Sequence, residues 1–169
     1  MNKNRNPVLG RDAIERRLLA AYGANQMIWA DGVWDKYITD YPIDSLARFT
    51  GAGHVLINLP DNPDWDKPFH ANAYETYDIL KTAGLELEVI PEPEYPRVKS
   101  IDFVAPYAKF YACNGAVIAA EFGDRETDKI ARTALARHYP GREIVKLHVD
   151  ALGEVGSGIH CATQQLPSA

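Results

Sequence analysis

The fold class is decided by the stretch Lys109-Phe-Tyr-Ala-Cys-Asn-Gly-Ala-Val-Ile-Ala-Ala-Glu-Phe122. Its centre, Asn114-Gly115, is the strongest short-range signal for a β-hairpin, because both residue types accept the positive φ angles of a two-residue turn. Mainly apolar residues flank this turn on both sides. We therefore expect two antiparallel strands, at residues 109–113 and 116–122.

A helix and a further strand are predicted directly after this hairpin. The helix covers about residues 126–139 and is closed by Pro140-Gly141, a pair that a helix does not continue through. Residues 143–149 then form a strand. The predicted order is strand-strand-helix-strand.

The same order is predicted earlier in the chain. Two strands at 45–50 and 54–59 flank a turn with Gly51 and Gly53, followed by a helix at 69–83 and a strand at 85–90. A long-period repeat of one supersecondary unit favours a propeller-like or solenoid α/β array. The alternative is one ordinary α/β sheet with two hairpins that are similar by chance.

The chain ends predict partial units. Residues 12–22 form a helix, with Asp12 as N-cap and Glu15 as its capping-box partner, and residues 27–30 form a short buried strand. A new strand begins at Ile159. We expect an array that is cut at both ends, with a partial unit at 1–44, repeats at 45–91 and 101–150, and a terminal strand at 151–169.

Composition restricts the class of protein. The 169 residues are 46% hydrophobic and 24% charged, which is typical of one soluble globular domain, and the net charge of −5 argues against a nucleic-acid partner. Cys113 and Cys161 fit neither a zinc spacing nor a disulfide framework, so we expect free thiols in a cytoplasmic protein. The N-terminal residues lack the apolar stretch of a signal peptide, and we expect no membrane partner.

Cys161 is the sharpest candidate for chemistry. It follows the glycine-rich residues 153–158, where the backbone can pass close to a ligand, and polar residues 163–165 come after it. A nucleophilic cysteine needs a neighbouring acid or base. His160 is adjacent, but in an extended segment consecutive side chains point to opposite faces, so we expect that group to come from elsewhere. A structural free cysteine is the alternative.

Asp40, Asp44 and Arg48 form a second candidate group. Asp44 lies where a loop enters a strand, and a carboxylate there could hold a planar cation such as guanidinium with two hydrogen bonds. The alternative is an Asp–Arg ion pair that stabilises the loop.

Other polar residues predict no site. The remaining histidines lack the spacing of metal ligands, and the aspartates of residues 61–66 lack the spacing of a calcium loop. The glycines of residues 153–158 do not form a nucleotide fingerprint. The histidines concerned are His54, His70, His138 and His148.

Four segments carry a family resemblance. They are Asn2-Lys-Asn-Arg-Asn-Pro7, Ile38-Thr-Asp-Tyr-Pro-Ile-Asp-Ser-Leu-Ala-Arg-Phe49, Phe110-Tyr-Ala-Cys-Asn-Gly-Ala-Val117 and Gly156-Ser-Gly-Ile-His-Cys-Ala-Thr-Gln-Gln165. In this order they resemble the C-terminal half of the agmatine deiminase / bacterial-type peptidyl-arginine deiminase family.

The resemblance implies a pentein fold, a ring of five strand-strand-helix-strand units around a central site. It implies that Cys161 attacks the guanidinium carbon of agmatine or an arginine-type substrate, that Asp44 binds the cationic group, and that Gly156 and Gly158 support the site. Ammonia leaves, and a thiouronium adduct is hydrolysed to an N-carbamoyl product. No cofactor and no metal are expected.

Two positions depart from the family pattern. Pro42 stands where the family has its catalytic histidine, and Lys109 stands where an asparagine is expected. We therefore keep two functional hypotheses, a guanidine-modifying hydrolase and an inactive homologue that acts as a binding or assembly module. The expected partners are a small guanidinium substrate and either a second copy of the chain or a complementary half-chain.

Overall fold

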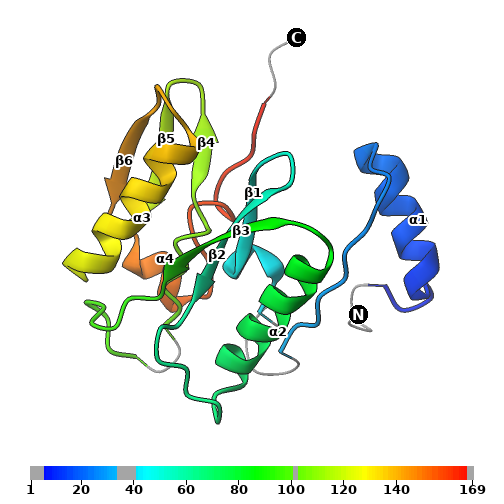
Figure 1. Cartoon of the computed structure of the whole chain (residues 1–169), viewed down its shortest axis with the longest axis horizontal. Coiled ribbons are helices and arrows are strands. Elements are labelled where there is room, and N and C mark those ends of the chain that lie inside the picture. Colours follow the sequence, from blue (N-terminus) through cyan, green and yellow to red (C-terminus); the bar gives the residue numbers. More distant parts are fainter. Residues whose placement is uncertain (1–5, 34–40, 101–102, 167–169) are drawn as a thin grey trace.

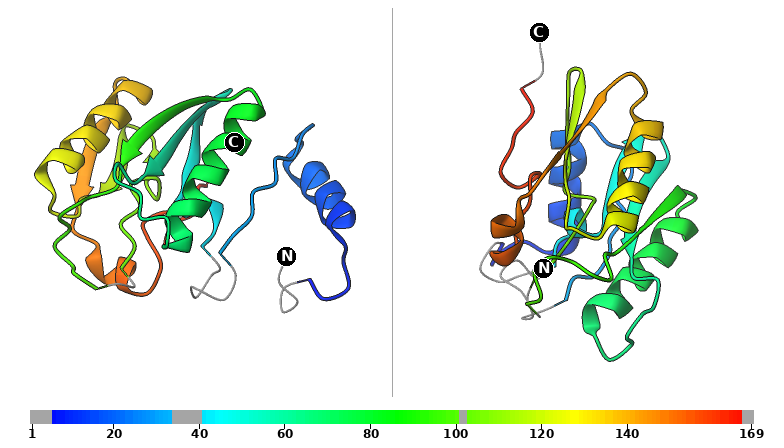
Figure 2. Two further views of the ribbon diagram at one scale, coloured as in Figure 1. Left: turned by 60° about the horizontal axis from the view of Figure 1, so that its bottom comes forward. Right: turned by 90° about the vertical axis from the view of Figure 1, so that its left-hand side faces the viewer.

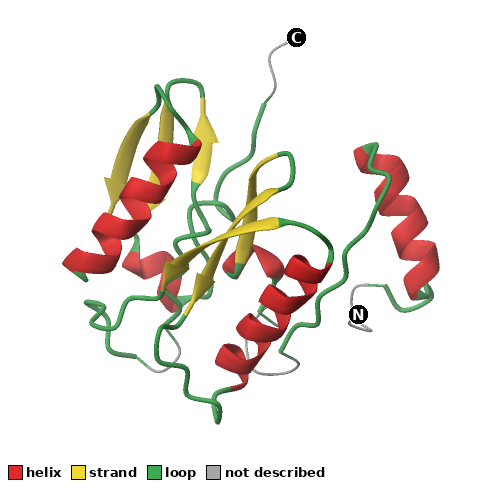
Figure 3. Ribbon diagram, viewed as in Figure 1, coloured by secondary structure: helices red, strands yellow, loops and turns green. Residues whose placement is uncertain are grey.

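The computed structural model describes residues 6–33, 41–100 and 103–166. Its strands form two three-stranded sheets, shown in Figure 1 and by element type in Figure 3. In each sheet the middle strand pairs antiparallel with the strand before it and parallel with the strand after a crossover helix. The strand-strand-helix-strand order therefore occurs twice, as predicted, while closure into a five-unit ring stays a prediction.

The first sheet has the strand order β1-β2-β3. Its strands are β1 (Ala47–Gly51), β2 (His54–Leu59) and β3 (Glu86–Pro91), and α2 (Pro68–Thr82) is the crossover helix. Proline is favourable at the first helical position because its missing N–H group would have no partner there.

The second sheet has the strand order β4-β5-β6. It contains β4 (Tyr111–Cys113), β5 (Ala116–Ala120) and β6 (Glu143–Leu147), with α3 (Arg125–His138) as the crossover helix. Gly115 has a φ of 82°, which confirms the turn predicted at Asn114-Gly115.

The two units share a hydrophobic core. Leu56 of β2 and Ile90 of β3 belong to the same buried cluster as Phe110 and Val117 of the second unit. Apolar side chains removed from water in this way supply the main favourable term in folding. The units are therefore packed against each other and do not form independent bodies.

Buried polar contacts also join the units. Asn58 of β2 is 1% exposed; its Nδ2 donates to the Ile90 carbonyl at 3.3 Å, and its Oδ1 accepts from the N–H of Ala108 at 2.8 Å. A second, partly buried contact joins β3 to α3, where Glu88 Oε2 lies 2.8 Å from His138 Nε2. These contacts fix the position of the second sheet relative to the first.

The start of α3 is held by Asp124. Its carboxylate accepts from the N–H groups of Glu126 and Thr127 at the helix start, and from those of Glu94 and Tyr95 in the proline-rich connector. Burial alone would raise the pKa of Asp124, but these backbone donors together hold it below its ordinary value.

The N-terminal helix differs from its prediction. α1 (Arg11–Tyr22) begins after Gly10, whose backbone is extended, and no side chain caps it, so the predicted Asp12–Glu15 capping box is wrong. Glu15 instead accepts a hydrogen bond from Trp29 Nε1 at 2.7 Å. No residue of α1 is buried, and Figure 2 shows this helix standing apart from the two sheets.

Two predicted strands are also absent from the described residues. Residues 27–30 carry no ladder pairing, and the segment is held through side-chain contacts; Asn72 Nδ2, for example, donates to the Asp31 carbonyl at 2.7 Å. In place of the terminal strand predicted at 151–169, the described residues contain α4 (Asp150–Glu154) and, around Ile159, a series of turns. The reason is local, since Gly156 has a φ of 74° and directs the chain out of α4 into a turn.

No helix within the described residues is long and apolar enough to cross a membrane.

Candidate functional site

Three side chains from distant parts of the sequence meet at one place. His160 Nδ1 lies 2.9 Å from Asp44 Oδ2, and Cys161 Sγ donates to the same oxygen at 3.5 Å. One ligand atom from each residue lies within 4.8 Å of the others. Cys161 is exposed, and Asp44 and His160 are partly exposed, so solutes can reach all three.

Asp44 is placed by a single turn of 3₁₀ helix, η1 (Ile43–Ser45), directly before β1. The turn is closed by the Ser45 N–H bonded to the Pro42 carbonyl at 2.9 Å, and by the Leu46 N–H bonded to the Ile43 carbonyl at 2.9 Å. Leu46 is 1% exposed and anchors the end of the turn in the core. The Asp44 carboxylate is therefore presented from a fixed backbone.

Cys161 is placed by the turns that follow α4. The buried Ile159 anchors this segment, and the His160 N–H donates to the Lys109 carbonyl at 3.1 Å. Thr163 Oγ1 donates to the Ile159 carbonyl at 2.8 Å, which closes the turn around the thiol. The segment is thus hydrogen-bonded to the chain just before β4 of the second unit.

Lys109 and Gly158 are in close steric contact. A Cβ atom at Gly158 would lie 2.7 Å from Lys109 Cδ and 2.8 Å from its Cβ, so a larger residue would collide with the lysine stem. Lys109 is 3% exposed, and its Nζ donates to the Gly156 carbonyl at 3.2 Å. Lys109 therefore supports the turn that carries Cys161.

The predicted orientation of His160 is wrong. We expected His160 and Cys161 to point to opposite faces of a strand, but residues 159–162 form turns, with the Ala162 N–H bonded to the carbonyls of Gly158 and Ile159 at 3.2 Å. In a turn, neighbouring side chains can point the same way. The group of glycines before His160 was the signal that could have indicated this.

The alternative interpretation of this group, an Asp–Arg ion pair, is not found between Asp44 and Arg48 in the described part of the chain. Arg48 lies over the Phe110 ring, with its guanidinium carbon 4.7 Å from the ring centre, and donates to the Phe110 carbonyl. Burial lowers the pKa of Arg48, while the neighbouring Tyr139 and Asp44 act in the opposite direction. No ion pair joins Asp44 to Arg48 among the described residues. Asp40 lies outside them.

The other histidines are engaged with glutamates, away from the thiol. Each of the four imidazoles contacts a glutamate carboxylate. Among the described residues, none of the four contacts Cys161. The pairs are His54–Glu86, His70–Glu92, His138–Glu88 and His148–Glu121.

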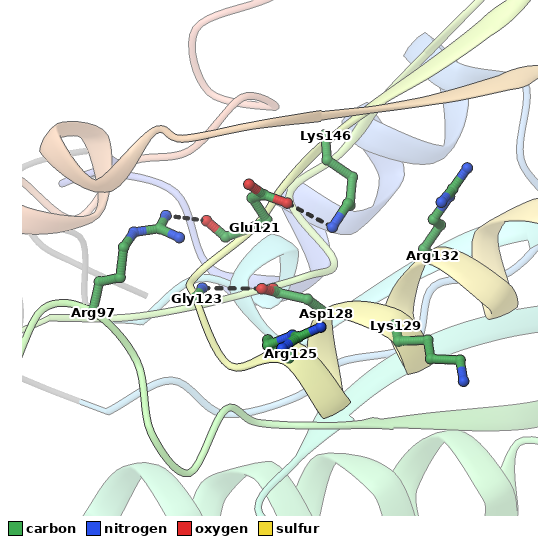
Figure 4. A pocket seen from close by; sticks show the side chains of 8 residues that line it. All are labelled: Arg97, Glu121, Gly123, Arg125, Asp128, Lys129, Arg132 and Lys146. Atoms are coloured by element: carbon green, nitrogen blue, oxygen red, sulfur yellow. Dashed lines mark hydrogen bonds and ion pairs between the residues drawn. The ribbon is translucent and has the colours of Figure 1, made fainter.

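A separate cavity of about 270 Å³ lies at the start of α3, shown in Figure 4. Some of its charged groups are paired: Glu121 contacts Lys146 at 2.5 Å, and Arg97 contacts Asp150 at 2.9 Å. Arg125, Lys129 and Arg132 also line the cavity, and no ion pair among the described residues involves them. The Lys146 contact is the main reason that the pKa of Glu121 is lowered. Asp128 accepts from backbone N–H groups, including that of Gly123 at 3.0 Å. We interpret these contacts as support for the β5–α3 connection.

The comparison with protein families decides the relationship. The model of the Porphyromonas-type peptidyl-arginine deiminase family matches residues 1–167. The chain belongs to this family. Among curated members, the agmatine deiminase of Medicago truncatula is 32% identical over 99% of the chain, and that of Pseudomonas putida is also 32% identical over 99%. The chain spans about half the length of these relatives, 51% in both cases.

Solved structures of deiminases have the same fold as this family member. An agmatine deiminase of C. jejuni with substrate bound matches 96% of the chain with a TM-score of 0.83 at 26% identity. That of Enterococcus faecalis matches 98% with a TM-score of 0.82 at 25% identity. The chain covers 48% and 51% of these two structures. The predicted α/β class and the resemblance to the deiminase family are confirmed, and the propeller-like ring stays a prediction.

Proposed function

We propose that this chain carries the thiol and one carboxylate of a site that hydrolyses a guanidinium group, with agmatine or an arginine-type compound as substrate. The observation that carries the proposal is the contact between Cys161 Sγ and Asp44 Oδ2 at 3.5 Å. A thiol in contact with a carboxylate supports the roles proposed for them, a nucleophile and an acceptor for a planar cation. The deiminase relatives support the same class of reaction.

Asp44 has an oxygen available for a substrate. Both of its contacts with His160 and Cys161 use Oδ2, and no hydrogen bond among the described residues uses Oδ1. A guanidinium group that donates to Oδ1 would bring its carbon close to Cys161 Sγ. Such positioning converts a bimolecular attack into a local step, which is a large part of enzymatic rate acceleration.

The chemistry needs a thiolate and a carrier of protons. Cys161 Sγ forms a bond to the guanidinium carbon, one C–N bond breaks, and the leaving nitrogen takes a proton and departs as ammonia. The thiouronium adduct then adds water at the same carbon, the C–S bond breaks, and the ureido product and the thiolate are released. We assign the proton transfers to His160, because Pro42 has no titratable group.

Further contacts to the substrate would come from a second polypeptide segment. The two sheets have edge strands, and natural proteins rarely leave such edges unpaired. A second copy of this chain, or a complementary half-chain, would cover these edges and add groups opposite Asp44 and Cys161. We expect a stable dimer of the 18.8 kDa chain by size exclusion with light scattering; a monomer would contradict the second copy and leave the complementary half-chain as the proposed partner.

A second function is favoured by Pro42. This residue precedes η1 and supplies the carbonyl that closes it, so its role in the structure is to shape the turn. A family member without an imidazole at this position could bind a partner or ligand without turnover. The assay below separates the two functions.

The test is formation of ureido product from agmatine, measured by a colour assay. We expect product from the unmodified chain and from Cys113→Ala, the matched thiol control, and none from Cys161→Ala. Pro42→His adds an imidazole next to the site and should raise the rate. Absence of product from both the unmodified chain and Pro42→His would contradict the hydrolase proposal and favour the assembly module.

A further inference from the structure

We propose that Asp44, His160 and Cys161 form a binding site for a thiolate-seeking divalent cation, of which Zn²⁺ is the representative. The inference rests on the distances between these side chains and is independent of any turnover. Asp44 and His160 are far apart in the sequence. Only the tertiary structure brings them together with Cys161.

The distances approach those of a tetrahedral site. Zn²⁺ bonds of about 2.3 Å to sulfur and about 2.0–2.1 Å to nitrogen and oxygen place the ligand atoms about 3.3–3.6 Å apart. The observed separations are 3.5 Å between Cys161 Sγ and Asp44 Oδ2, and 2.9 Å between His160 Nδ1 and the same oxygen. One ligand atom from each of the three residues lies within 4.8 Å of the others, so rotation of the His160 and Cys161 side chains toward each other completes the set around an ion.

The donor set selects the class of metal. One sulfur, one imidazole nitrogen and one carboxylate oxygen suit Zn²⁺ and its transition-metal neighbours, whereas Mg²⁺ and Ca²⁺ prefer oxygen ligands alone. Three protein ligands leave a fourth position for water, as in open zinc sites. Two of the three ligands carry a negative charge once the thiol is deprotonated, which balances the charge of the ion.

Binding has a defined proton balance. The Cys161 thiol loses its proton to solvent when the metal–sulfur bond forms, and the His160–Asp44 hydrogen bond is replaced by bonds to the ion. The backbone needs no large rearrangement, since Asp44 is held by the η1 turn and Cys161 by the turns after α4. Entry from solvent is open because Cys161 is exposed.

The same atoms are used by the proposed hydrolase, and this consequence rests on the proposed function. An ion bound to Cys161 Sγ and Asp44 removes both the nucleophile and the acceptor for guanidinium. Metal and substrate would therefore exclude each other, and the metal would act as a reversible inhibitor. Metal binding itself is measured without substrate, so failure of the hydrolase proposal leaves this inference testable.

The experiment uses Co²⁺ as a coloured substitute for the colourless Zn²⁺, on chain first treated with chelator. We expect one Co²⁺ per chain, with the near-ultraviolet charge-transfer band of a cobalt–thiolate bond, and displacement of the band by Zn²⁺. Cys161→Ser should lose the band, and His160→Gln and Asp44→Asn should weaken binding about tenfold or more. Cys113→Ser and His54→Gln are matched controls and should bind like the unmodified chain.

A second readout uses the unmodified chain alone, so its result does not depend on whether the variants fold. In the unmodified chain, Zn²⁺ should protect Cys161 from alkylation, as located by peptide mass spectrometry, and should leave the rate at Cys113 unchanged. Absence of the band in the unmodified chain, a band that survives Cys161→Ser, or equal protection of both thiols would each overturn the proposal.

Discussion

His160 Nδ1 and Asp44 Oδ2 lie 2.9 Å apart, although the two residues are 116 positions apart in the sequence. This contact joins the turn before β1 to the turns after α4 and brings Cys161 to the same carboxylate. A thiol, an imidazole and a carboxylate are thereby in contact at one place in this chain. The arrangement supports both the proposed hydrolase and the proposed metal site.

The role of His160 in proton transfer predicts a specific loss of rate. Replacement of a general acid or base lowers turnover by about 10²–10⁴-fold, so His160→Gln should lower kcat by this amount and flatten the pH–rate profile. His54→Gln, which removes an imidazole paired with Glu86 elsewhere, should change neither. The measurement is ureido product formation across a pH series, and an unchanged kcat in His160→Gln would contradict the assignment.

The contact between Lys109 and Gly158 predicts coupled effects on stability. Gly158→Ala places a methyl group 2.7 Å from Lys109 Cδ, and the free energy of unfolding should fall by about 1–3 kcal/mol. Lys109→Ala removes Cγ and Cδ but keeps Cβ, so the double variant should lose less than the sum of the two single variants. Urea denaturation measures all three.

Gly51→Ala is the matched control, because a methyl group there meets only the His54 ring at 3.9 Å, an ordinary contact, and it should change stability by less than about 0.5 kcal/mol. Full additivity of the Gly158 and Lys109 substitutions would show that the two residues do not constrain each other.

The buried carboxylate of Asp128 predicts a large stability loss on neutralisation. It accepts from the Tyr107 hydroxyl at 2.9 Å and from the N–H groups of Phe122 at 2.9 Å and Gly123 at 3.0 Å. Asp128→Asn replaces an acceptor with a donor in this network, and the free energy of unfolding should fall by about 1–3 kcal/mol. Asp78→Asn, at an exposed position of α2, should have little effect in the same denaturation experiment.

Glu92 predicts a pH-dependent stability. Burial raises the pKa of Glu92 from its ordinary value near 4.5 to about 7, and it outweighs the opposite effect of the nearby Lys67 ammonium. Between these two pH values the folded chain therefore binds more protons than the unfolded chain, so the free energy of unfolding falls as the pH rises through this window.

Glu92→Gln removes this dependence and should make the chain more stable above pH 7 by about 1–3 kcal/mol, measured by urea denaturation at pH 4.5 and 8. Glu75→Gln on α2 is the exposed control. A variant that is less stable than the unmodified chain at pH 8 would show that the ionised carboxylate is stabilising.

Much of the fold could be predicted because its signals are local. The turn at Asn114-Gly115, the strands around it and the helix α3 follow from turn chemistry and from the stop signal Pro140-Gly141. The helix start at Arg11 was missed because Glu15 is engaged by Trp29, a tertiary contact that no spacing indicates.

The candidate site could be predicted only in part. Cys161 and Asp44 were found from their sequence surroundings and from the family resemblance, and their roles stay predictions. The position of His160 was missed, because it depends on a turn where an extended strand was expected. The support from Lys109 was missed for a similar reason, since a buried lysine packed on a glycine is visible only in three dimensions.

The central claim is that Asp44 and Cys161 act together on a planar cation, and labelling by 2-chloroacetamidine tests it most directly. The amidinium group of this reagent resembles guanidinium and its chloromethyl carbon alkylates thiols, whereas 2-chloroacetamide, with the same leaving group, is its uncharged counterpart. Peptide mass spectrometry should show chloroacetamidine at Cys161 well before Cys113, with agmatine slowing the reaction and Asp44→Asn removing the preference for the cation. Equal labelling of both thiols, or a preference that survives Asp44→Asn, would contradict the claim.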